Sequence, residues 1–136
     1  MSVRYLNPEG HPLPAGRYSH VAMAEPGRLA FIAGQVAVDA DGALLSPGDV
    51  AGQMPVVFRN VGNVLAQIGA SFSDVLELTT YLVGEEAREP WMAARGDVYA
   101  EHYGNGPYPP NTLLIISGLA HKDMKVEISA IVRLPD

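Results

Sequence analysis

The chain has 136 residues, a formal net charge of −6, and a composition that is 48% hydrophobic and 18% charged. This length is typical of one domain, taken here as residues 1–136, and it allows a buried core. No run of about 18 apolar residues is present, so we expect no membrane-spanning segment. Lys and Arg are scattered singly, whereas nucleic-acid binding needs a cationic surface along the phosphates. The sequence therefore favours a small-molecule ligand and disfavours a nucleic acid.

The absence of cysteine excludes disulfides, thiolate metal sites and a cysteine nucleophile. The histidines do not show the spacing of metal ligands, so we predict no metal site. The first four residues lead into a polar segment without the apolar core of a signal peptide. Together these features lead us to expect a cytoplasmic protein.

The first third of the chain is predicted to form β-structure. Residues 7–17 are rich in Pro and Gly and predict a lead-in without a helix. Residues 18–24 and 29–38 have the composition of short strands, and "EPGR" at 25–28 lies between them. Pro26-Gly27 favours a tight turn, so we predict a hairpin. A second turn, "DADG" at 39–42, ends this unit.

From Asp49 onwards the apolar residues recur at helical spacing, and Gly69 predicts the end of that helix. Pro55 lies about one turn inside and predicts an irregularity near its start. The apolar side of the helix consists of Val50, Met54, Val57, Val61, Val64, Leu65 and Ile68.

The second half alternates between strands and a helix. Residues 73–83 predict a strand, 85–103 a second helix, 113–116 a strand and 124–133 the last strand, with the loop "GNGPYPPN" at 104–111 ending the helix. The inner face of the second helix is expected to carry Ala87, Trp91, Ala94 and Val98. In the last strand, Val126, Ile128, Ala130 and Val132 alternate with Lys125, Glu127 and Ser129.

The predicted order of elements is ββαβαββ, which indicates an α+β fold with two helices on one face of a sheet. Residues 113–116 are apolar on both faces, and the chain offers no third helix for the second face. A strand buried on both faces needs a cover. Other copies of the chain are the simplest cover, so we expect self-association.

Four stretches carry a more specific pattern: "GRYSH" (16–20), "AGQVAVDADG" (33–42), "DVAGQMPVVFRNVGNVLAQIGASFSDVLELTTYLV" (49–83) and "KDMKVEISAIV" (122–132). The most specific pieces are G-x-Y-S, G-Q followed by a D-x-x-G turn, and K-x-E-x-x-A-I. In this order they resemble the Rid family, also called YjgF-like or reactive-intermediate deaminase proteins. The resemblance covers nearly the whole chain.

The resemblance implies a chorismate-mutase-like α+β fold and a homotrimer around a central sheet barrel, with small-molecule clefts between subunits. Many members hydrolyse imines or enamines, such as 2-aminoacrylate, to a ketone and ammonia without metal or organic cofactor. The leading hypothesis is therefore a hydrolase (deaminase) of this type. A non-catalytic small-molecule-binding or pathway accessory protein that uses the same cleft is the second. RNA cleavage, an activity sometimes ascribed to the family, is disfavoured by the acidic charge.

The loop before the fifth strand departs from the family pattern. In deaminating members it carries an arginine that binds the substrate carboxylate, for which a bidentate guanidinium is well suited. Alignment places Asn111 there, directly after Pro109-Pro110. An amide cannot supply the charge, so we expect a substrate other than the usual 2-imino acid. Asn111 is expected either to face a ligand, with backbone groups of Thr112 and Leu113 beside it, or to cap its own turn.

Other family positions suggest further site residues. Glu127 matches the carboxylate that positions water and would act as a general base; the alternative is a solvated strand glutamate. Tyr18 and Tyr99 match aromatic residues that line the cleft, and ordinary packing is the alternative for both. Gly34 would expose backbone to a ligand or allow a close strand approach.

Two residues differ from the usual family pattern close to the cleft tyrosine. Arg17 replaces a usual proline and is a candidate for restoring positive charge, with a solvated arginine as the alternative. His20 stands where glutamine is usual and would titrate near neutral pH. The alternative for His20 is an ordinary surface histidine.

Overall fold

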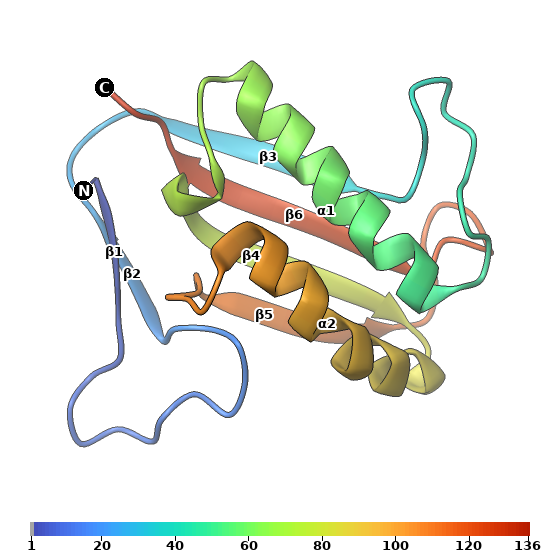
Figure 1. Ribbon diagram of the computed structural model, residues 1–136, viewed down its shortest axis with the longest axis horizontal. Coiled ribbons are helices and arrows are strands. Elements are labelled where there is room, and N and C mark those ends of the chain that lie inside the picture. Colours follow the sequence, from blue (N-terminus) through green and yellow to red (C-terminus); the bar gives the residue numbers. More distant parts are fainter. Residues whose placement is uncertain (1) are drawn as a thin grey trace.

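The structure is a computed structural model that describes residues 2–136 (Figure 1). Two helices lie on one face of a four-stranded sheet, and a two-stranded sheet lies at one end of it. The elements in chain order are β1 (Val3–Leu6), β2 (Val21–Ala24), β3 (Leu29–Gln35), α1 (Val50–Gln67), a 3-10 turn (Phe72–Asp74), β4 (Val75–Val83), a second 3-10 turn (Glu85–Ala87), α2 (Arg88–Tyr103), β5 (Asn111–Ile116) and β6 (Val126–Arg133).

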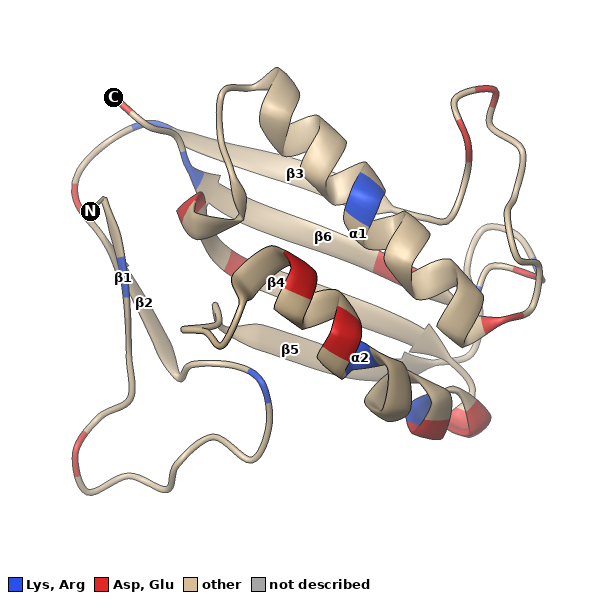
Figure 2. Ribbon diagram, in the orientation of Figure 1, with Lys and Arg blue, Asp and Glu red and all other residues tan. Residues whose placement is uncertain are grey.

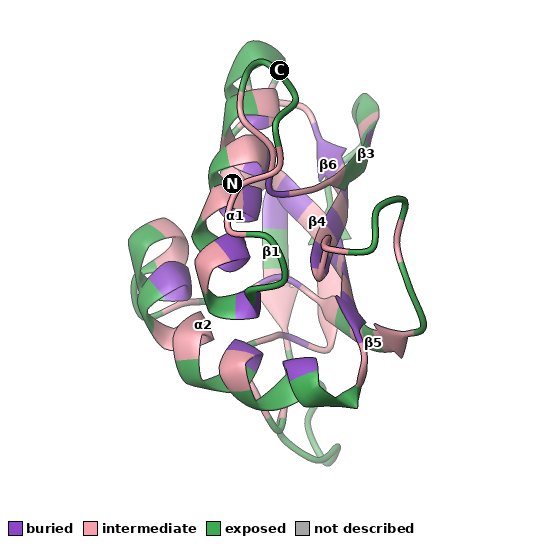
Figure 3. Ribbon diagram, turned by 90° about the vertical axis from the view of Figure 1, so that its right-hand side faces the viewer, coloured by how far each residue is buried: buried purple, intermediate pink, exposed green. Residues whose placement is uncertain are grey.

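The predicted α+β architecture is confirmed, with the order β3-β6-β4-β5 in the larger sheet. The β4–β5 pair is parallel, and the other pairs are antiparallel. Both helices cover the same side of this sheet (Figure 3). We call the uncovered side the open face. No helix within residues 2–136 combines the length and hydrophobicity needed to cross a bilayer.

The two strongest sequence patterns form the core. Helix α1 begins at Val50 and ends one residue before Ile68, and Gly69 follows in the left-handed region with φ of 74°. Pro55 lies in the helix on its exposed side and does not interrupt it. In β6 every second residue from Val126 to Val132 is buried under the helices. Glu127 therefore lies on the open face, as the alternation predicts.

The predicted hairpin of residues 18–24 and 29–38 is wrong. Strand β2 pairs with β1, a strand that sequence inspection did not find, while β3 pairs with β6. The "EPGR" segment is a linker between the two sheets, held by the buried guanidinium of Arg133. Its Nε donates to Glu25 O at 3.2 Å and its Nη2 donates to Pro26 O at 2.5 Å. These bonds hold the linker against the end of β6, so the segment does not form a hairpin turn.

Strand β5 also differs from its prediction. It begins at Asn111, two residues earlier than expected, and it is the edge strand of the sheet. Leu113 and Ile115 pack against the core, whereas Leu114 is 41% exposed on the open face. The strand is therefore apolar on both faces but buried on only one of them in the single chain.

Candidate functional site

Asn111 is tied to two neighbouring elements on the helix side of the sheet. Thr80 Oγ1 of β4 donates to Asn111 Oδ1 at 3.0 Å, and Asn111 Nδ2 donates to the Tyr99 hydroxyl at 2.9 Å. The parallel register places Asn111 beside Leu78 at the very start of β5. The amide therefore links β4, β5 and α2, and one N–H of Nδ2 is left for another acceptor.

Tyr99 is buried behind this amide, and burial raises the pKa of its hydroxyl to about 12. The hydrogen bond from Asn111 and the charges of Arg95 and Arg17 act in the opposite direction. Tyr99 therefore stays protonated at neutral pH. We call Thr80, Tyr99 and Asn111 the helix-side group.

Two arginines lie next to this group. Arg17 Nη1 donates to the Tyr108 hydroxyl at 3.4 Å, and the Tyr108 ring lies 5.8 Å from that of Tyr99 between centroids. Arg95 of α2 lies against the lead-in loop that carries Arg17. A Cβ added to Gly16 of that loop would lie only 3.1 Å from Arg95 Nη1. Neither arginine forms a salt bridge within residues 2–136. Arg17, which the sequence suggests as an added positive charge, is therefore accompanied by Arg95.

Tyr18 and His20 belong to the lead-in loop. The Tyr18 hydroxyl accepts a hydrogen bond from Ala15 N at 3.4 Å, and its ring meets His20 edge-on at 5.6 Å. His20 Nε2 lies 2.8 Å from Pro12 O, and its backbone N donates to Asn7 Oδ1 at 2.9 Å. In the single chain these bonds fold the loop back on itself.

Glu127 and Gly34 meet on the open face. A Cβ on Gly34 would lie 2.5 Å from Cδ of Glu127, so the carboxylate side chain passes directly over the glycine. The crossing lies where the register between β3 and β6 shifts, between Ile32 and Gln35. Glu127 is half-buried and forms no salt bridge within residues 2–136. We call Gly34 and Glu127 the open-face group.

The two groups lie on opposite faces of the same sheet. Asn111 contacts the buried side of β4 through Thr80, whereas Glu127 pairs with Tyr81 and faces away from the helices. Thr112 is exposed on the open face and Leu113 packs towards the helices. A single chain therefore does not bring all the predicted site residues into one pocket.

A family model described as Endoribonuclease L-PSP matches residues 9–134 of the chain. The crystal structure of a conserved Rid family protein of unknown function, YyfB from Yersinia pestis, is 32% identical, covers 98% of this chain and 100% of its own, and superimposes with a TM-score of 0.86. The chain belongs to the Rid family. A RutC family protein from Pyrococcus horikoshii is 34% identical over 123 residues, which are 90% of this chain and 91% of the relative.

Relatives of this Rid protein from goat, cattle and rat carry the name of a reaction. The 2-iminobutanoate/2-iminopropanoate deaminase of Capra hircus is 27% identical over 94% of this chain and 88% of its own. The name describes the goat protein.

Three residues that lie next to the site in this Rid protein were not predicted from its sequence. Thr80 and Arg95 lie in regular elements and carry no local motif, so only the strand register and the loop path reveal them. Tyr108 stands in the proline-rich loop before Asn111, where its position was a usable signal. Within residues 2–136, no three His, Asp or Glu side chains are grouped to hold a metal ion.

Proposed function

We propose that this Rid protein hydrolyses a reactive imine or enamine to a carbonyl compound and ammonia, in a cleft between copies of a homotrimer. The observation that carries the proposal is the half-buried carboxylate of Glu127, which lies over Gly34 without a salt bridge. A carboxylate that is not neutralised by a cation remains available to accept a proton from water.

The chemistry requires only water and an acid–base group. Glu127 takes a proton from water as the water oxygen attacks the carbon of C=N, and it returns that proton to the nitrogen, whose lone pair comes from the broken π bond, so that a carbinolamine forms. Glu127 then takes the proton of the carbinolamine hydroxyl and passes it to the nitrogen. The C=O bond forms as the C–N bond breaks, ammonia leaves, and Glu127 is again a carboxylate. An enamine enters the same route after protonation at carbon gives the imine.

Assembly is part of the proposal, because the two groups face opposite sides of the sheet. Three large apolar side chains are exposed on the open-face side of the sheet: Phe31 at 73%, Leu29 at 52% and Leu114 at 41%. Leu29 and Phe31 lie two residues apart on β3 and form an apolar patch of the kind found at interfaces, while Leu114 lies on the opposite outer strand, β5. We propose that the open faces pack together, and that the start of the edge strand β5, where Asn111 lies, comes beside Glu127 of the next copy.

The substrate is proposed to lack the carboxylate of a 2-imino acid. The amide of Asn111 donates a hydrogen bond but carries no charge, and it is held by Thr80 and Tyr99. It suits a carbonyl or neutral amide on the substrate better than a carboxylate. Asn111 is proposed to occupy the position at which the deaminating relatives carry arginine.

Substrate preference gives the direct test. We expect ammonia release from neutral imines, and weak or absent release from 2-iminopropanoate generated in place by an amino-acid oxidase. Asn111→Arg is expected to raise kcat/KM for 2-iminopropanoate by roughly 10- to 100-fold, since a charge-assisted hydrogen bond contributes about 1.5–3 kcal/mol. Thermal unfolding checks that the variant folds.

Substitution of Arg17 tests whether this residue binds a substrate carboxylate instead. If the unmodified protein turns over 2-iminopropanoate rapidly and Arg17→Ala does not, the proposal of a neutral substrate is refuted. Binding of the carboxylate is then assigned to Arg17. Arg95→Ala separates the two guanidinium groups, because both lie beside Tyr99 but only Arg17 donates to Tyr108.

A non-catalytic binding protein is the second candidate function. The observation in its favour is that Oδ1 and Nδ2 of Asn111 each already have a hydrogen-bond partner in the protein. An amide held in this way suits a binding site that is formed before the ligand arrives. RNA cleavage has less support, because Lys and Arg are scattered singly and α2 carries acidic residues on its outer side (Figure 2). A binder would take up a ligand in the cleft and release no ammonia from any imine tested.

A further inference from the structure

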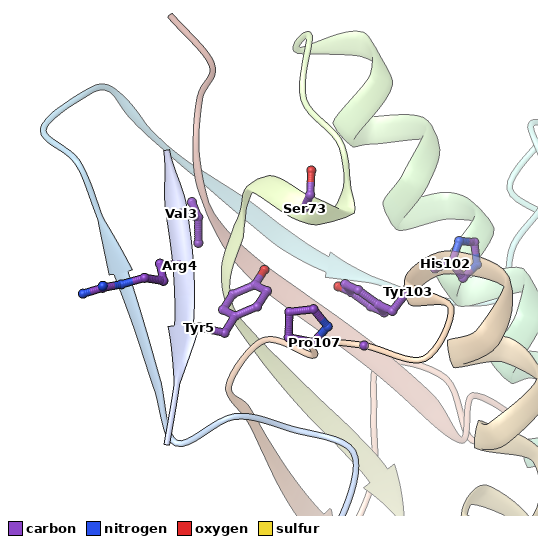
Figure 4. A pocket seen from close by; sticks show the side chains of 8 residues that line it. Val3, Arg4, Tyr5, Ser73, His102, Tyr103 and Pro107 are labelled. Carbon is purple, nitrogen blue, oxygen red and sulfur yellow. The ribbon is translucent and has the colours of Figure 1, made fainter. Parts of the chain in front are cut away.

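A cavity of about 530 Å³ lies apart from both groups, between β1, the first 3-10 turn and the end of α2 (Figure 4). Tyr5, Tyr103 and Pro107 form its walls, with Val3 and Ser73 towards its edge. This volume is in the usual range for small-molecule pockets. None of the site residues predicted from the sequence lines it.

Tyr103 brings an unused hydrogen-bond donor to this cavity. Its hydroxyl is buried and has no partner among residues 2–136. Its ring extends from the end of α2 towards Tyr5 across the cavity (Figure 4). The other two hydroxyls are occupied, because Tyr5 donates to Val75 O at 2.6 Å and Ser73 Oγ lies 2.8 Å from Ser71 Oγ. A buried donor without an acceptor is costly, so the Tyr103 hydroxyl favours a ligand that accepts from it.

The walls carry no net charge at neutral pH. Burial raises the pKa of Tyr5 and of Tyr103, so both stay protonated, and burial lowers the pKa of His102, partly opposed by the charge of Glu101. Arg4 points away from the cavity, towards Met23. The charge of Asp74 also acts on Tyr5, but Asp74 does not line the cavity and its carboxylate accepts a hydrogen bond from Ser71 N. A buried anion would therefore find no counter-charge here.

We propose that this cavity binds a small, neutral, mostly apolar molecule through one carbonyl oxygen that accepts a hydrogen bond from Tyr103. The aromatic walls supply contact area, and the hydroxyl selects for the acceptor. The site is separate from the proposed hydrolytic cleft and does not depend on that function. Tyr103 nevertheless packs on Tyr99 and Tyr108, at centroid distances of 6.2 and 6.1 Å, so it forms a shared wall with the helix-side group.

The test compares two probes of nearly the same shape, acetophenone and α-methylstyrene, which differ by the carbonyl acceptor. Each is titrated into the full-length protein and followed by NMR at the Val3 methyl groups and the Gly106 amide. We expect acetophenone to bind about fivefold more tightly, which corresponds to one net hydrogen bond. Tyr103→Phe is expected to remove this difference and leave α-methylstyrene binding unchanged.

Two further variants complete the design. Val3→Phe fills the cavity and is expected to weaken both probes, while Tyr81→Phe, on the open face, is expected to affect neither. Thermal unfolding checks each fold: Tyr103→Phe should keep or raise the melting temperature, because it removes an unpaired buried hydroxyl. The proposal is overturned if neither probe shifts the Val3 and Gly106 signals at millimolar concentration. It is equally overturned if Tyr103→Phe leaves the preference for acetophenone intact.

Discussion

Replacing Glu127 with Gln is expected to slow ammonia release from an imine substrate by about 10²- to 10⁴-fold, the usual contribution of a general base. This corresponds to roughly 3–5 kcal/mol of activation free energy. Gln keeps the shape of the side chain over Gly34 and its ability to hydrogen-bond, but it cannot take the proton from water. If the protein only binds its ligand, the same change would remove one hydrogen bond, of about 1 kcal/mol in affinity.

Glu77→Gln is the matched control for this variant. Glu77 is an exposed glutamate of β4 on the same open-face side of the sheet, so the substitution makes the same change in charge and size. We expect it to retain near-normal turnover. The measurement is the initial rate of ammonia release at saturating substrate, with ligand affinity determined in parallel. Equal rates for the Glu127 variant and the unmodified protein would rule out the role of Glu127 in activating water.

Replacing Phe31 with Glu is expected to convert the proposed homotrimer into monomers and to abolish turnover with it. Phe31 is 73% exposed in the single chain, on the open-face side of β3. Burying a Phe side chain contributes about 1.5–3 kcal/mol, and each copy in the trimer would contribute one such side chain. A carboxylate at the same place would instead be desolvated without a partner.

Leu13→Glu is the control for this second prediction. Leu13 is 81% exposed, more than Phe31, but it lies in the lead-in loop outside the sheets. We expect the Leu13 variant to remain trimeric at micromolar concentration in sedimentation velocity or light scattering. An unmodified protein that sediments as a monomer under these conditions would contradict the proposed assembly, and the intersubunit cleft with it.

Helices and strands whose apolar residues recur regularly were predictable, because that recurrence depends only on which side of the element packs against the core. The apolar residues of α1 and the alternation of β6 are of this kind, and they correctly placed Glu127 on the side away from the helices. The "EPGR" segment was not predictable in this way. Its path depends on hydrogen bonds from Arg133, more than a hundred residues further along the chain.

The sequence by itself determined the fold class, the family and the identity of the polar residues near the starts of β5 and β6. Only the tertiary structure decided their surroundings: Asn111 between Thr80 and Tyr99, Glu127 across Gly34, and the two groups on opposite faces of the sheet. The physical reason is the range of the forces involved. Side-chain period is a property of one segment, whereas hydrogen-bond partners and strand register depend on which distant segments pack together.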